Sequence, residues 1–311
     1  MKRTKILVTG GAGFIGSAMT EKLAQNPDFD IVVVDNLLTG NLLKLPKYPN
    51  VQFIHANVNE NKQIKDVFYG HGFDYVFHYA AVVGVQRTLK HPVSVLEDIH
   101  GIENILRLSK NTSVKHVFYA SSSEVYGEPV EFPQNEQTTP LNSRLPYAIV
   151  KNVGEAYLKS YHQEYGIPHT IFRFFNTYGP KQSRDFVISK FLALALKNEN
   201  ITIYGDGKQS RTFCFIDDNI DACYNAFIKK KHVNDVVNIG SHIETSIVEL
   251  AEVILKLTGS RSKIVHLPPL KDGDMTRRQP DNSKMLDLLG HDLLPLEKGI
   301  QKILDNPGFI L

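Results

Sequence analysis

The sequence is poor in cysteine. Only Cys214 and Cys223 occur among its 311 residues, nine positions apart. Two cysteines cannot form a disulfide framework, and neither has a Cys or His pair nearby at the spacing of a zinc site. We therefore expect both thiols to be reduced and no metal to be bound.

The sequence also lacks a strong charge of one sign and a long hydrophobic run. Thirty-five Lys and Arg face 33 Asp and Glu, a formal net charge of +2, which is not the basic excess of a nucleic-acid-binding protein. Apolar runs such as residues 31–34 are too short to span a bilayer, and the first ten residues lack the core of a signal peptide. We predict a cytoplasmic protein with no nucleic-acid or membrane partner.

Short apolar, β-branched runs instead alternate with stretches long enough for amphipathic helices. This alternation is typical of a parallel sheet with helical crossovers. Strands are predicted at residues 5–9, 31–35, 51–55, 75–78, 116–120 and 169–173. The fold class we predict is α/β, with a Rossmann-like, doubly wound parallel sheet.

A glycine-rich turn joins the first predicted strand to the helix predicted at residues 14–24. Gly11, Gly13 and Gly16 satisfy the spacing GxGxxG, and Gly10 with the latter two satisfies GxxGxxG. Both patterns allow backbone to approach a pyrophosphate at a helix N-terminus. A merely tight strand-to-helix turn is the alternative, but the position between strand and helix favours dinucleotide binding.

Asp35 ends the next strand, nineteen residues after Gly16. A carboxylate there accepts hydrogen bonds from the adenosine ribose hydroxyls and repels a 2′-phosphate, so the sequence predicts NAD rather than NADP. The alternative is that Asp35 only caps a turn at the strand end, which Asn36 permits.

After residue 173 the regular alternation of predicted strands and helices ends. Turn-rich segments at 176–180 and 204–209 are interspersed with helices predicted at 186–197 and 246–257. We assign residues 1–173, together with a return of the chain at 213–240, to an NAD-binding domain. Residues 174–212 and 241–311 then form a smaller α/β substrate-binding domain.

Tyr147 and Lys151 stand four residues apart in a segment that reads as a helix, which places both side chains on one face. An ammonium beside a phenol favours the ionised phenol. The pattern alone is weak, since Tyr204 and Lys208 share it across a glycine-containing loop, and a surface contact is the alternative. A hydroxyl and carboxylate cluster at residues 121–124 strengthens the functional interpretation, because it follows a strand and ligands of open α/β sheets bind at that edge.

Together these motifs closely resemble the extended short-chain dehydrogenases of the NAD-dependent epimerase/dehydratase family, enzymes that modify nucleotide-linked sugars. The resemblance covers nearly the whole chain. It is carried, in order, by residues 10–16, 35–36, 78–81, 121–127, 147 with 151, 173–180, 204–211 and 278–281.

The resemblance implies a shared first step of catalysis. Tyr147, as tyrosinate, takes the proton of the sugar C4 hydroxyl while the C4 hydride passes to NAD. Lys151 and the positive cofactor ring are expected to lower the pKa of Tyr147 from its ordinary value of about 10, which suits a general base. Ser122 hydrogen-bonds the C4 oxygen, and Lys151 also holds the nicotinamide ribose.

The family pattern also implies the binding residues. Besides Tyr147 and Lys151, the cofactor is expected to contact Gly10, Gly13, Phe14, Ile15, Gly16, Asp35, Asn36, Asn57, Val58, Ala80 and Ala81. The nucleotide sugar is expected to contact Arg87, Ser123, Glu124, Asn176, Arg211 and Arg278, the arginines being suited to phosphate. The alternative for each arginine is a surface ion pair. Asn57 departs from the family, where relatives usually carry Asp near the adenine.

Few residues distinguish the reactions that follow C4 oxidation. Ser122, Ser123 and Glu124 resemble the Thr-Ser-Glu of UDP-glucuronate decarboxylases, and dTDP-glucose dehydratases have Asp in place of Ser123. GDP-mannose dehydratases also carry Ser then Glu, so a dehydratase stays open. Segments 185–190, 201–213 and 277–281 look like the decarboxylases, whereas 80–87 and 273–275 look like UDP-hexose or UDP-hexuronate 4-epimerases.

The sequence thus favours a UDP-glucuronate decarboxylase, with Ser123 and Arg278 orienting the C5 carboxylate and Glu124 assisting. A 4-epimerase is the next hypothesis and a 4,6-dehydratase the third. A non-catalytic NAD-binding regulator is an alternative of another class, since fold alone does not give function, but the intact Ser122, Tyr147 and Lys151 argue against it. Relatives commonly form dimers through two helices, here residues 93–109 and 147–165, so we expect a homodimer.

Overall fold

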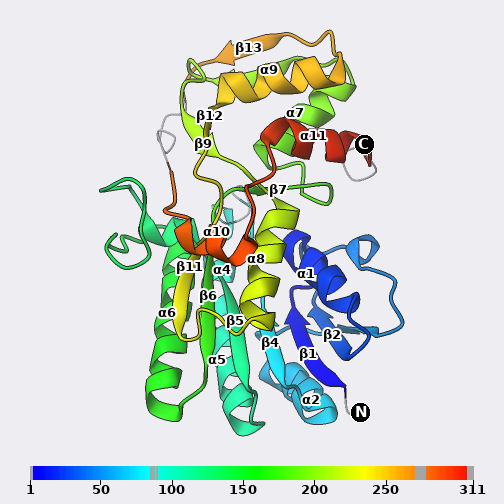
Figure 1. Ribbon diagram of the computed structural model, residues 1–311, viewed down its shortest axis with the longest axis vertical. Helices are drawn as coiled ribbons and strands as arrows, with labels where there is room; N and C mark the ends of the chain where they lie inside the picture. The colour runs from blue at the N-terminus through cyan, green and yellow to red at the C-terminus, as the bar shows by residue number, and fades with distance from the viewer. Residues whose placement is uncertain (1–2, 85–87, 89, 270–277, 307–311) are drawn as a thin grey trace. The chain divides into compact units, whose positions relative to one another are not determined.

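The computed structural model describes residues 3–84, 88, 90–269 and 278–306 (Figure 1). The chain falls into two compact units. The first consists of Met1–Gly127, Leu141–Phe174 and Ile220–Val237, and the second of Glu128–Pro140, Phe175–Asn219 and Asn238–Leu311. Within the described ranges, no helix combines the length and the apolar character needed to cross a membrane.

The first unit is built on a seven-stranded sheet of order β11-β6-β5-β4-β1-β2-β3, whose order reverses between β1 and β4. All five pairings among β1 to β6 are parallel. The strands are β1 (Thr4–Thr9), β2 (Phe29–Asp35), β3 (Val51–His55), β4 (Tyr75–His78), β5 (His116–Ser122), β6 (His169–Phe174) and β11 (Asp235–Ile239). The predicted Rossmann-like sheet is confirmed, with each predicted strand within two residues of its expected bounds.

Helices cover both faces of this sheet (Figure 1). On one face α5 (Asp98–Asn111) packs against α2 (Asn61–His71) and α6 (Pro146–Tyr165), and α4 (Pro92–Leu96) packs against α6. On the other face lie α1 (Phe14–Ala24) and the part of α8 (Ile216–Ile228) that belongs to this unit. Lys22 of α1 and Asp221 of α8 form an ion pair there at 2.7 Å.

Alternate strand residues supply the two cores, because successive side chains of a strand point to opposite faces. Val76 and Tyr119 belong to the core beneath α2, α5 and α6. Phe77 and Phe118, their neighbours in sequence, stack on each other at 4.5 Å and both contact Phe227 of α8 edge-on. Burial on both faces explains why the strands read as near-continuous apolar runs.

The helix predicted at residues 93–109 is two helices. α4 ends at Leu96 and α5 begins at Asp98, and Glu97 between them keeps helical angles of φ −60° and ψ −23°. Asp98 is buried and accepts a hydrogen bond from the Val82 backbone at 2.6 Å. The helix predicted at 147–165 agrees with α6.

The second unit contains three two-stranded sheets: β10 (Cys214–Phe215) with β7 (Thr177–Tyr178), β12 (Glu244–Ser246) with β9 (Ser210–Thr212), and β13 (Ile264–Leu267) with β8 (Ile201–Tyr204). Its helices include α7 (Val187–Leu196), α9 (Ile247–Thr258), α10 (Ser283–Leu289) and α11 (Leu296–Leu304). α9 starts with a capping box, in which the Ser246 side chain accepts from the Glu249 backbone and Glu249 accepts from the Ser246 backbone.

Three buried histidines occupy strand ends of the first unit. Burial, reinforced by the charge of Lys151, lowers the pKa of His78 to about 3. Burial likewise lowers the pKa of His169 to about 4, with a smaller contribution from His162. The pKa of His116 is also about 4, because of burial and the neighbouring His169. His116 Nε2 lies 2.9 Å from the Thr170 hydroxyl, which satisfies a neutral imidazole. These side chains are therefore uncharged in the folded protein near neutral pH.

We predict that acid destabilises the protein through these histidines. Their pKa values are lower in the folded than in the unfolded chain, so the unfolded chain binds more protons below about pH 6.5, and stability is lost as pH falls. Each histidine contributes a loss of about 2 kcal/mol between pH 7 and pH 5. Urea unfolding followed by circular dichroism measures this loss.

The matched variants are His116→Gln and His291→Gln. The first removes one buried titrating group and should reduce the pH dependence of the unfolding free energy by about one histidine's share. The second changes an exposed histidine and should leave that dependence as it is. An unfolding free energy that is flat between pH 7 and pH 5 contradicts the prediction.

Candidate active site

The turn after β1 brings backbone close to backbone. Gly10 has a φ of +70°, and a Cβ there would lie 2.6 Å from the Ala80 nitrogen. A Cβ on Gly16 would lie 2.3 Å from the Gly10 oxygen. Gly13 caps α1 with no side-chain hydrogen bond, so the first N–H groups of the helix have no side chain competing for them. A turn of this kind forms a backbone cradle for an anion at the helix N-terminus.

Asp35 ends β2 and is held in place by backbone. Its Oδ2 accepts from the Ala12 nitrogen at 3.0 Å and its Oδ1 from the Leu37 nitrogen at 2.8 Å. A carboxylate has about four lone-pair positions, so two remain for further donors. The carboxylate is therefore oriented beside the glycine turn and keeps the capacity to accept from two ribose hydroxyls.

A pocket lies next to this turn at the carboxyl ends of β1, β2 and β4. It is lined by Gly10, Val34, Asp35, Asn36, Leu38, Ala56, Asn57, Val58, Asn59, Ala80, Ala81, Val82, Ser94, Glu97 and Asp98. The order of the sheet reverses between β1 and β4, and ligands of doubly wound folds bind at such a switch point. Glycine backbone, an oriented carboxylate and small apolar side chains fit an adenine dinucleotide.

Seven of the residues predicted to bind the cofactor line this one pocket, namely Gly10, Asp35, Asn36, Asn57, Val58, Ala80 and Ala81. Gly13, Phe14, Ile15 and Gly16 form the adjoining cap and first turn of α1. Asn57 forms hydrogen bonds with nearby residues. Its side-chain Oδ1 accepts from the Asn59 backbone nitrogen, and its backbone nitrogen donates to the Gln63 side chain.

The predicted hydroxyl and carboxylate cluster lies where β5 ends. Ser122 is the last residue of β5, and its Oγ accepts from the Glu124 backbone at 3.2 Å, which caps the short 3-10 helix η2 (Ser123–Tyr126). Ser122 and Ser123 are buried, whereas Glu124 is partly exposed. The cap turns the chain so that both serines and the carboxylate follow one another within a single turn.

Helix α6 carries Tyr147 and Lys151 and packs against both β5 and η2. Pro146 occupies its first turn, where a missing N–H costs nothing. Lys151 Nζ donates to the Ala120 carbonyl at 2.6 Å and lies 5.8 Å from the centre of the Tyr147 ring. The predicted pair thus stands on one helix face beside the end of β5.

The second Tyr-x-x-x-Lys match has a different structure. Tyr204 ends β8, and Gly205 and Gly207 follow with φ angles of +68° and +74°. The backbone between Tyr204 and Lys208 is therefore not helical, and the match does not place the two side chains on a common face.

Burial sets the electrostatics around Lys151. Desolvation lowers the pKa of Lys151 to about 8, while the carboxylate of Asp98 acts to raise it. Desolvation raises the pKa of Asp98, and Lys151 acts in the opposite direction. The ring of His78 stacks against Tyr119, and its Nδ1 forms a hydrogen bond with the Thr9 hydroxyl. Because the pKa of His78 is about 3, this imidazole is neutral. Lys151 therefore has no positively charged imidazole beside it near neutral pH.

Two residues near Lys151 carried no sequence signal. Asp98 lines the pocket beside the glycine turn, but in the sequence it is one carboxylate within a predicted helix. Gly154 reads as an ordinary helix residue, yet a Cβ there would lie 2.2 Å from the Tyr119 hydroxyl. Only the packing of α6 on β5 reveals that this glycine allows the Tyr119 ring to lie beneath Lys151, 5.0 Å from Nζ.

Three of the residues predicted to bind the nucleotide sugar, Asn176, Arg211 and Arg278, belong to the second unit, whereas Ser123 and Glu124 belong to the first. Arg211 lies in β9 and donates to the Ser210 carbonyl, and Arg278 is buried. The backbone carbonyl of Asn176 accepts from the Cys214 backbone nitrogen, and the buried side-chain Nδ2 of Asn176 has no hydrogen-bond partner among the described residues. Arg87 lies outside the described residues, as do segments 85–87 and 273–275 of the 4-epimerase resemblance.

Comparisons with known proteins agree with this geometry. The model of the NAD dependent epimerase/dehydratase family matches residues 6–240. A putative UDP-glucose 4-epimerase of Methanocaldococcus jannaschii is 35% identical over 305 residues, covering 96% of this chain and 97% of that one. UDP-glucuronic acid decarboxylase 1 of Danio rerio is 34% identical over 311 residues, which cover 96% of this chain and 72% of that one. The crystal structure of a Thermotoga maritima UDP-glucose 4-epimerase with UDP-glucose superposes with a TM-score of 0.91 at 33% identity, covering 97% and 98%.

The fold and the pocket define a dinucleotide-dependent enzyme with a Rossmann-like sheet. The chain belongs to the NAD dependent epimerase/dehydratase family. It is an enzyme that uses NAD, and its relatives act on nucleotide sugars. The roles of the individual site residues, and the division of cofactor and substrate binding between the two units, stay predictions.

We predict that Gly10→Ala weakens NAD binding about 10-fold or more, a loss of about 1.4 kcal/mol, because the new Cβ meets backbone of Ala80. Gly72→Ala is the matched control. Gly72 has nearly the same φ, +67°, but a Cβ there meets no atom within 4 Å. Both variants carry the same left-handed strain of about 1–2 kcal/mol, and only the first should lose NAD affinity in a calorimetric titration. Equal affinities in the two variants contradict the assignment of this turn.

We predict that Gly154→Ala destabilises the protein by about 1–3 kcal/mol, because the added methyl group collides with the Tyr119 hydroxyl. Gly70→Ala is the control, since Gly70 lies in helix α2 with no atom within 4 Å of a Cβ and is exposed. Because alanine has a higher helix propensity than glycine, this substitution should stabilise the folded protein by up to about 1 kcal/mol. Opposite signs in urea unfolding support the packing, and two stabilising substitutions contradict it.

Proposed function

We propose that this enzyme decarboxylates UDP-glucuronate through a 4-keto sugar. The observation that carries the proposal is the turn at the end of β5, where Ser122 caps a helix that presents Ser123 and Glu124 directly after it. The order of two hydroxyls and a carboxylate resembles the corresponding loop of UDP-glucuronate decarboxylases. Sequence similarity to such decarboxylases supports the same activity.

The first step uses residues of β5 and α6. NAD, when bound, supplies the acceptor for the hydride of the sugar C4. Tyr147 removes the proton from the C4 hydroxyl, since the Lys151 ammonium near its ring favours the phenolate. Ser122 donates to the C4 oxygen as it becomes a carbonyl. Because Lys151 is anchored to the Ala120 carbonyl, its charge has a fixed position relative to the end of β5.

Oxidation at C4 turns the C5 carboxylate into a β-keto acid. The C5–carboxylate bond then breaks, carbon dioxide leaves, and the electron pair moves into the C4 carbonyl as an enolate. Protonation at C5 and reduction at C4 complete the turnover, so NAD is regenerated. We propose that Ser123 and Arg278 orient the carboxylate and that Glu124 positions it or handles the proton delivered to C5.

The nucleotide part is assigned to residues of the second unit. The buried side-chain Nδ2 of Asn176 carries two N–H donors and has no hydrogen-bond partner among the described residues. We propose that an oxygen of the diphosphate accepts from it, because a buried donor left without an acceptor costs free energy. Arg211 and Arg278 suit the same anionic group, because a guanidinium donates in a fixed fork. UDP is the nucleotide we propose, on the similarity to enzymes of UDP-sugars. A cytoplasmic location and a homodimer stay predictions from the sequence.

A 4-epimerase is the second candidate. The specific observation in its favour is the similarity over almost the full length to a UDP-glucose 4-epimerase of known structure. An epimerase shares the first step with a decarboxylase but returns the hydride to the opposite face of C4. Loss of the C5 substituent is therefore what separates the two activities.

A product assay decides between them. The purified enzyme is incubated separately with UDP-glucuronate, UDP-glucose, UDP-N-acetylglucosamine and GDP-sugars, and products are identified by chromatography and mass spectrometry. Loss of carbon dioxide from UDP-glucuronate is the expected result. An unchanged mass with a new retention time establishes a 4-epimerase, and loss of water a dehydratase. Either of these two results overturns the proposal.

We predict that Glu124→Gln lowers product formation about 100-fold or more, the scale of a lost acid–base group, with no change in NAD affinity. Glu128→Gln is the control, because Glu128 is an exposed carboxylate shortly after the turn. It should retain wild-type rates. Equal losses of rate and of NAD affinity in the Glu124 variant contradict the role proposed for this carboxylate.

A further inference from the structure

A buried ion pair lies behind the proposed catalytic turn. Arg173 of β6 and Glu155 of α6 expose only 2% and 1% of their side chains. Glu155 Oε1 accepts from Arg173 Nε at 2.9 Å, and its Oε2 accepts from Nη2 at 2.7 Å. The pair is thus bidentate, the arrangement that most strictly fixes the relative position of two side chains.

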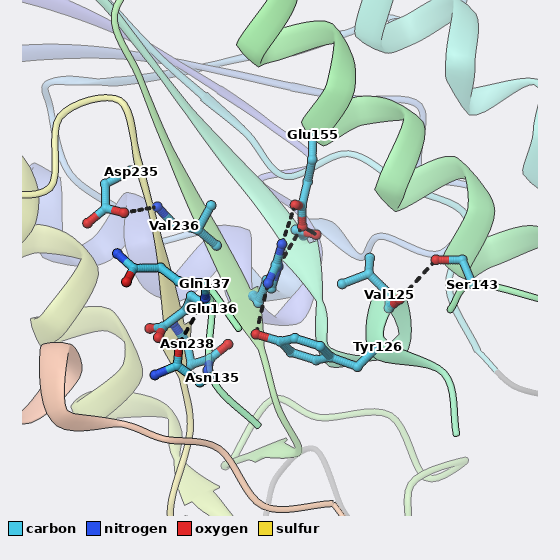
Figure 2. A network of polar contacts seen from close by, with 12 residues as sticks. Val125, Tyr126, Asn135, Glu136, Gln137, Ser143, Glu155, Asp235, Val236 and Asn238 are labelled. Atoms are coloured by element: carbon cyan, nitrogen blue, oxygen red, sulfur yellow. Dashed lines mark hydrogen bonds and ion pairs between the residues drawn. The ribbon is translucent and has the colours of Figure 1, made fainter. Parts of the chain in front are cut away.

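Two further side chains complete this group. The Ser121 hydroxyl donates to Glu155 Oε1 at 2.6 Å, and Arg173 Nη1 donates to the Tyr126 hydroxyl at 2.8 Å. Figure 2 shows Glu155 and Tyr126 at opposite ends of these hydrogen bonds. We call the set of Ser121, Tyr126, Glu155 and Arg173 the buried clamp. It joins β5, η2, α6 and β6.

Stability alone does not account for the clamp. Burying two charges costs most of what their attraction returns, so a well-packed apolar cluster would serve the fold as well. Desolvation acts to lower the pKa of Arg173, but Glu155 and Tyr126 outweigh it and raise the pKa above its ordinary value. The guanidinium is therefore charged, and its directional hydrogen bonds specify geometry as apolar contacts would not.

The clamp connects the two elements that hold the proposed catalytic groups. Glu155 stands on α6 four residues beyond Lys151, as Lys151 stands four beyond Tyr147, so the three share one side of the helix. Tyr126 ends the 3-10 helix η2 that contains Ser123 and Glu124. Arg173 therefore lies between the helix of the general base and the turn of the carboxylate.

Two hydrogen bonds fasten the same turn to the segment leading into α6. The Val125 carbonyl accepts from the Asn142 backbone nitrogen at 3.0 Å. It also accepts from the Ser143 hydroxyl at 3.0 Å (Figure 2). Gly127 follows with a φ of +62°, and a Cβ there would lie 2.0 Å from the Asn142 oxygen. The turn is thus restrained from two sides, by the clamp and by the segment leading into α6.

We propose that Tyr126 and Arg173 are positioning residues that set the place of Ser123 and Glu124 relative to Tyr147. This inference rests on the proposed function, because it concerns the steps assigned to that carboxylate. Lys151 is held by the Ala120 carbonyl and not by the clamp. Loosening the clamp at Tyr126 therefore disturbs the steps after C4 oxidation more than the oxidation itself.

The test is Tyr126→Phe, which removes one hydroxyl and leaves the Glu155–Arg173 pair intact. The expected result is a kcat about 10-fold to 100-fold lower, as for a catalytic group displaced by about 1 Å, with unchanged KM and NAD affinity. During turnover the bound cofactor should accumulate in its reduced form, seen by its absorbance. A purely structural contact would change neither the ratio of kcat to KM nor that absorbance.

The control is Tyr178→Phe. Tyr178 is as deeply buried as Tyr126, and its hydroxyl donates to the Leu296 carbonyl at 3.3 Å. Each variant removes a tyrosine hydroxyl that takes part in a hydrogen bond. Urea unfolding measures what each removal costs in stability, and rates are expressed per folded molecule. Only Tyr126→Phe should accumulate reduced cofactor. A Tyr126 variant with the kcat and absorbance of the wild type overturns the inference, as does an identical loss in both variants.

The outcome separates this inference from the proposed function. If the wild-type enzyme converts none of the UDP-sugars to a decarboxylated product, the proposed function fails, whatever the variants do. If it epimerises instead, the clamp is still tested by comparing kcat between the two tyrosine variants. Decarboxylation by the wild type with an unaffected Tyr126 variant leaves the function standing and removes the positioning role.

Discussion

The hydrogen bond from Lys151 Nζ to the Ala120 carbonyl is the constraint on which the site depends. It ties helix α6 to the end of β5 at 2.6 Å, and it brings an ammonium into a nearly water-free place. Gly154 permits this approach, because any larger residue would meet the Tyr119 hydroxyl. Tyr147, one turn earlier on α6, owes its position to the same contact. The proposed general base is thus placed by packing of helix on strand and not by a flexible loop.

The groups around this contact determine the pKa of Lys151. Burial lowers its pKa to about 8, Asp98 opposes that change, and His78 stays neutral because it is itself buried. The second buried cation, Arg173, is neutralised by Glu155 in a bidentate pair. Among the described residues of the first unit, two cations, Lys151 and Arg173, are thus buried in different electrostatic surroundings. Burial lowers the pKa of Lys151 to about 8, whereas the pKa of Arg173 is raised despite burial because Glu155 and Tyr126 hold the guanidinium.

In the mechanism proposed above, decarboxylation, epimerisation and dehydration diverge after a common oxidation at C4, and the residues assigned to the two stages lie on different elements. The groups proposed for C4 oxidation lie on β5 and α6 of the first unit, where the sheet fixes them. The groups proposed for the carboxylate and the nucleotide are Ser123 and Glu124 on η2, and Asn176, Arg211 and Arg278 in the second unit. If these roles are right, a change in the short turn or in the second unit should alter the product without disturbing the oxidation. Such an arrangement suits a fold that supports several chemistries.

The sequence by itself determined the sheet, the glycine turn, the Asp35 carboxylate and the Tyr147–Lys151 pair, because each is a local pattern with a fixed period or spacing. It also placed the hydroxyl and carboxylate cluster of residues 121–124 after a strand, although it did not predict the 3-10 helix η2. Only the tertiary structure decided that Glu155 and Arg173 form a buried pair, that Asp98 reaches Val82, that Gly154 must be small and that the helix at 93–109 is two. These features join residues from different elements. Their partners are chosen by how α5 and α6 pack on the sheet, which no spacing along one segment encodes.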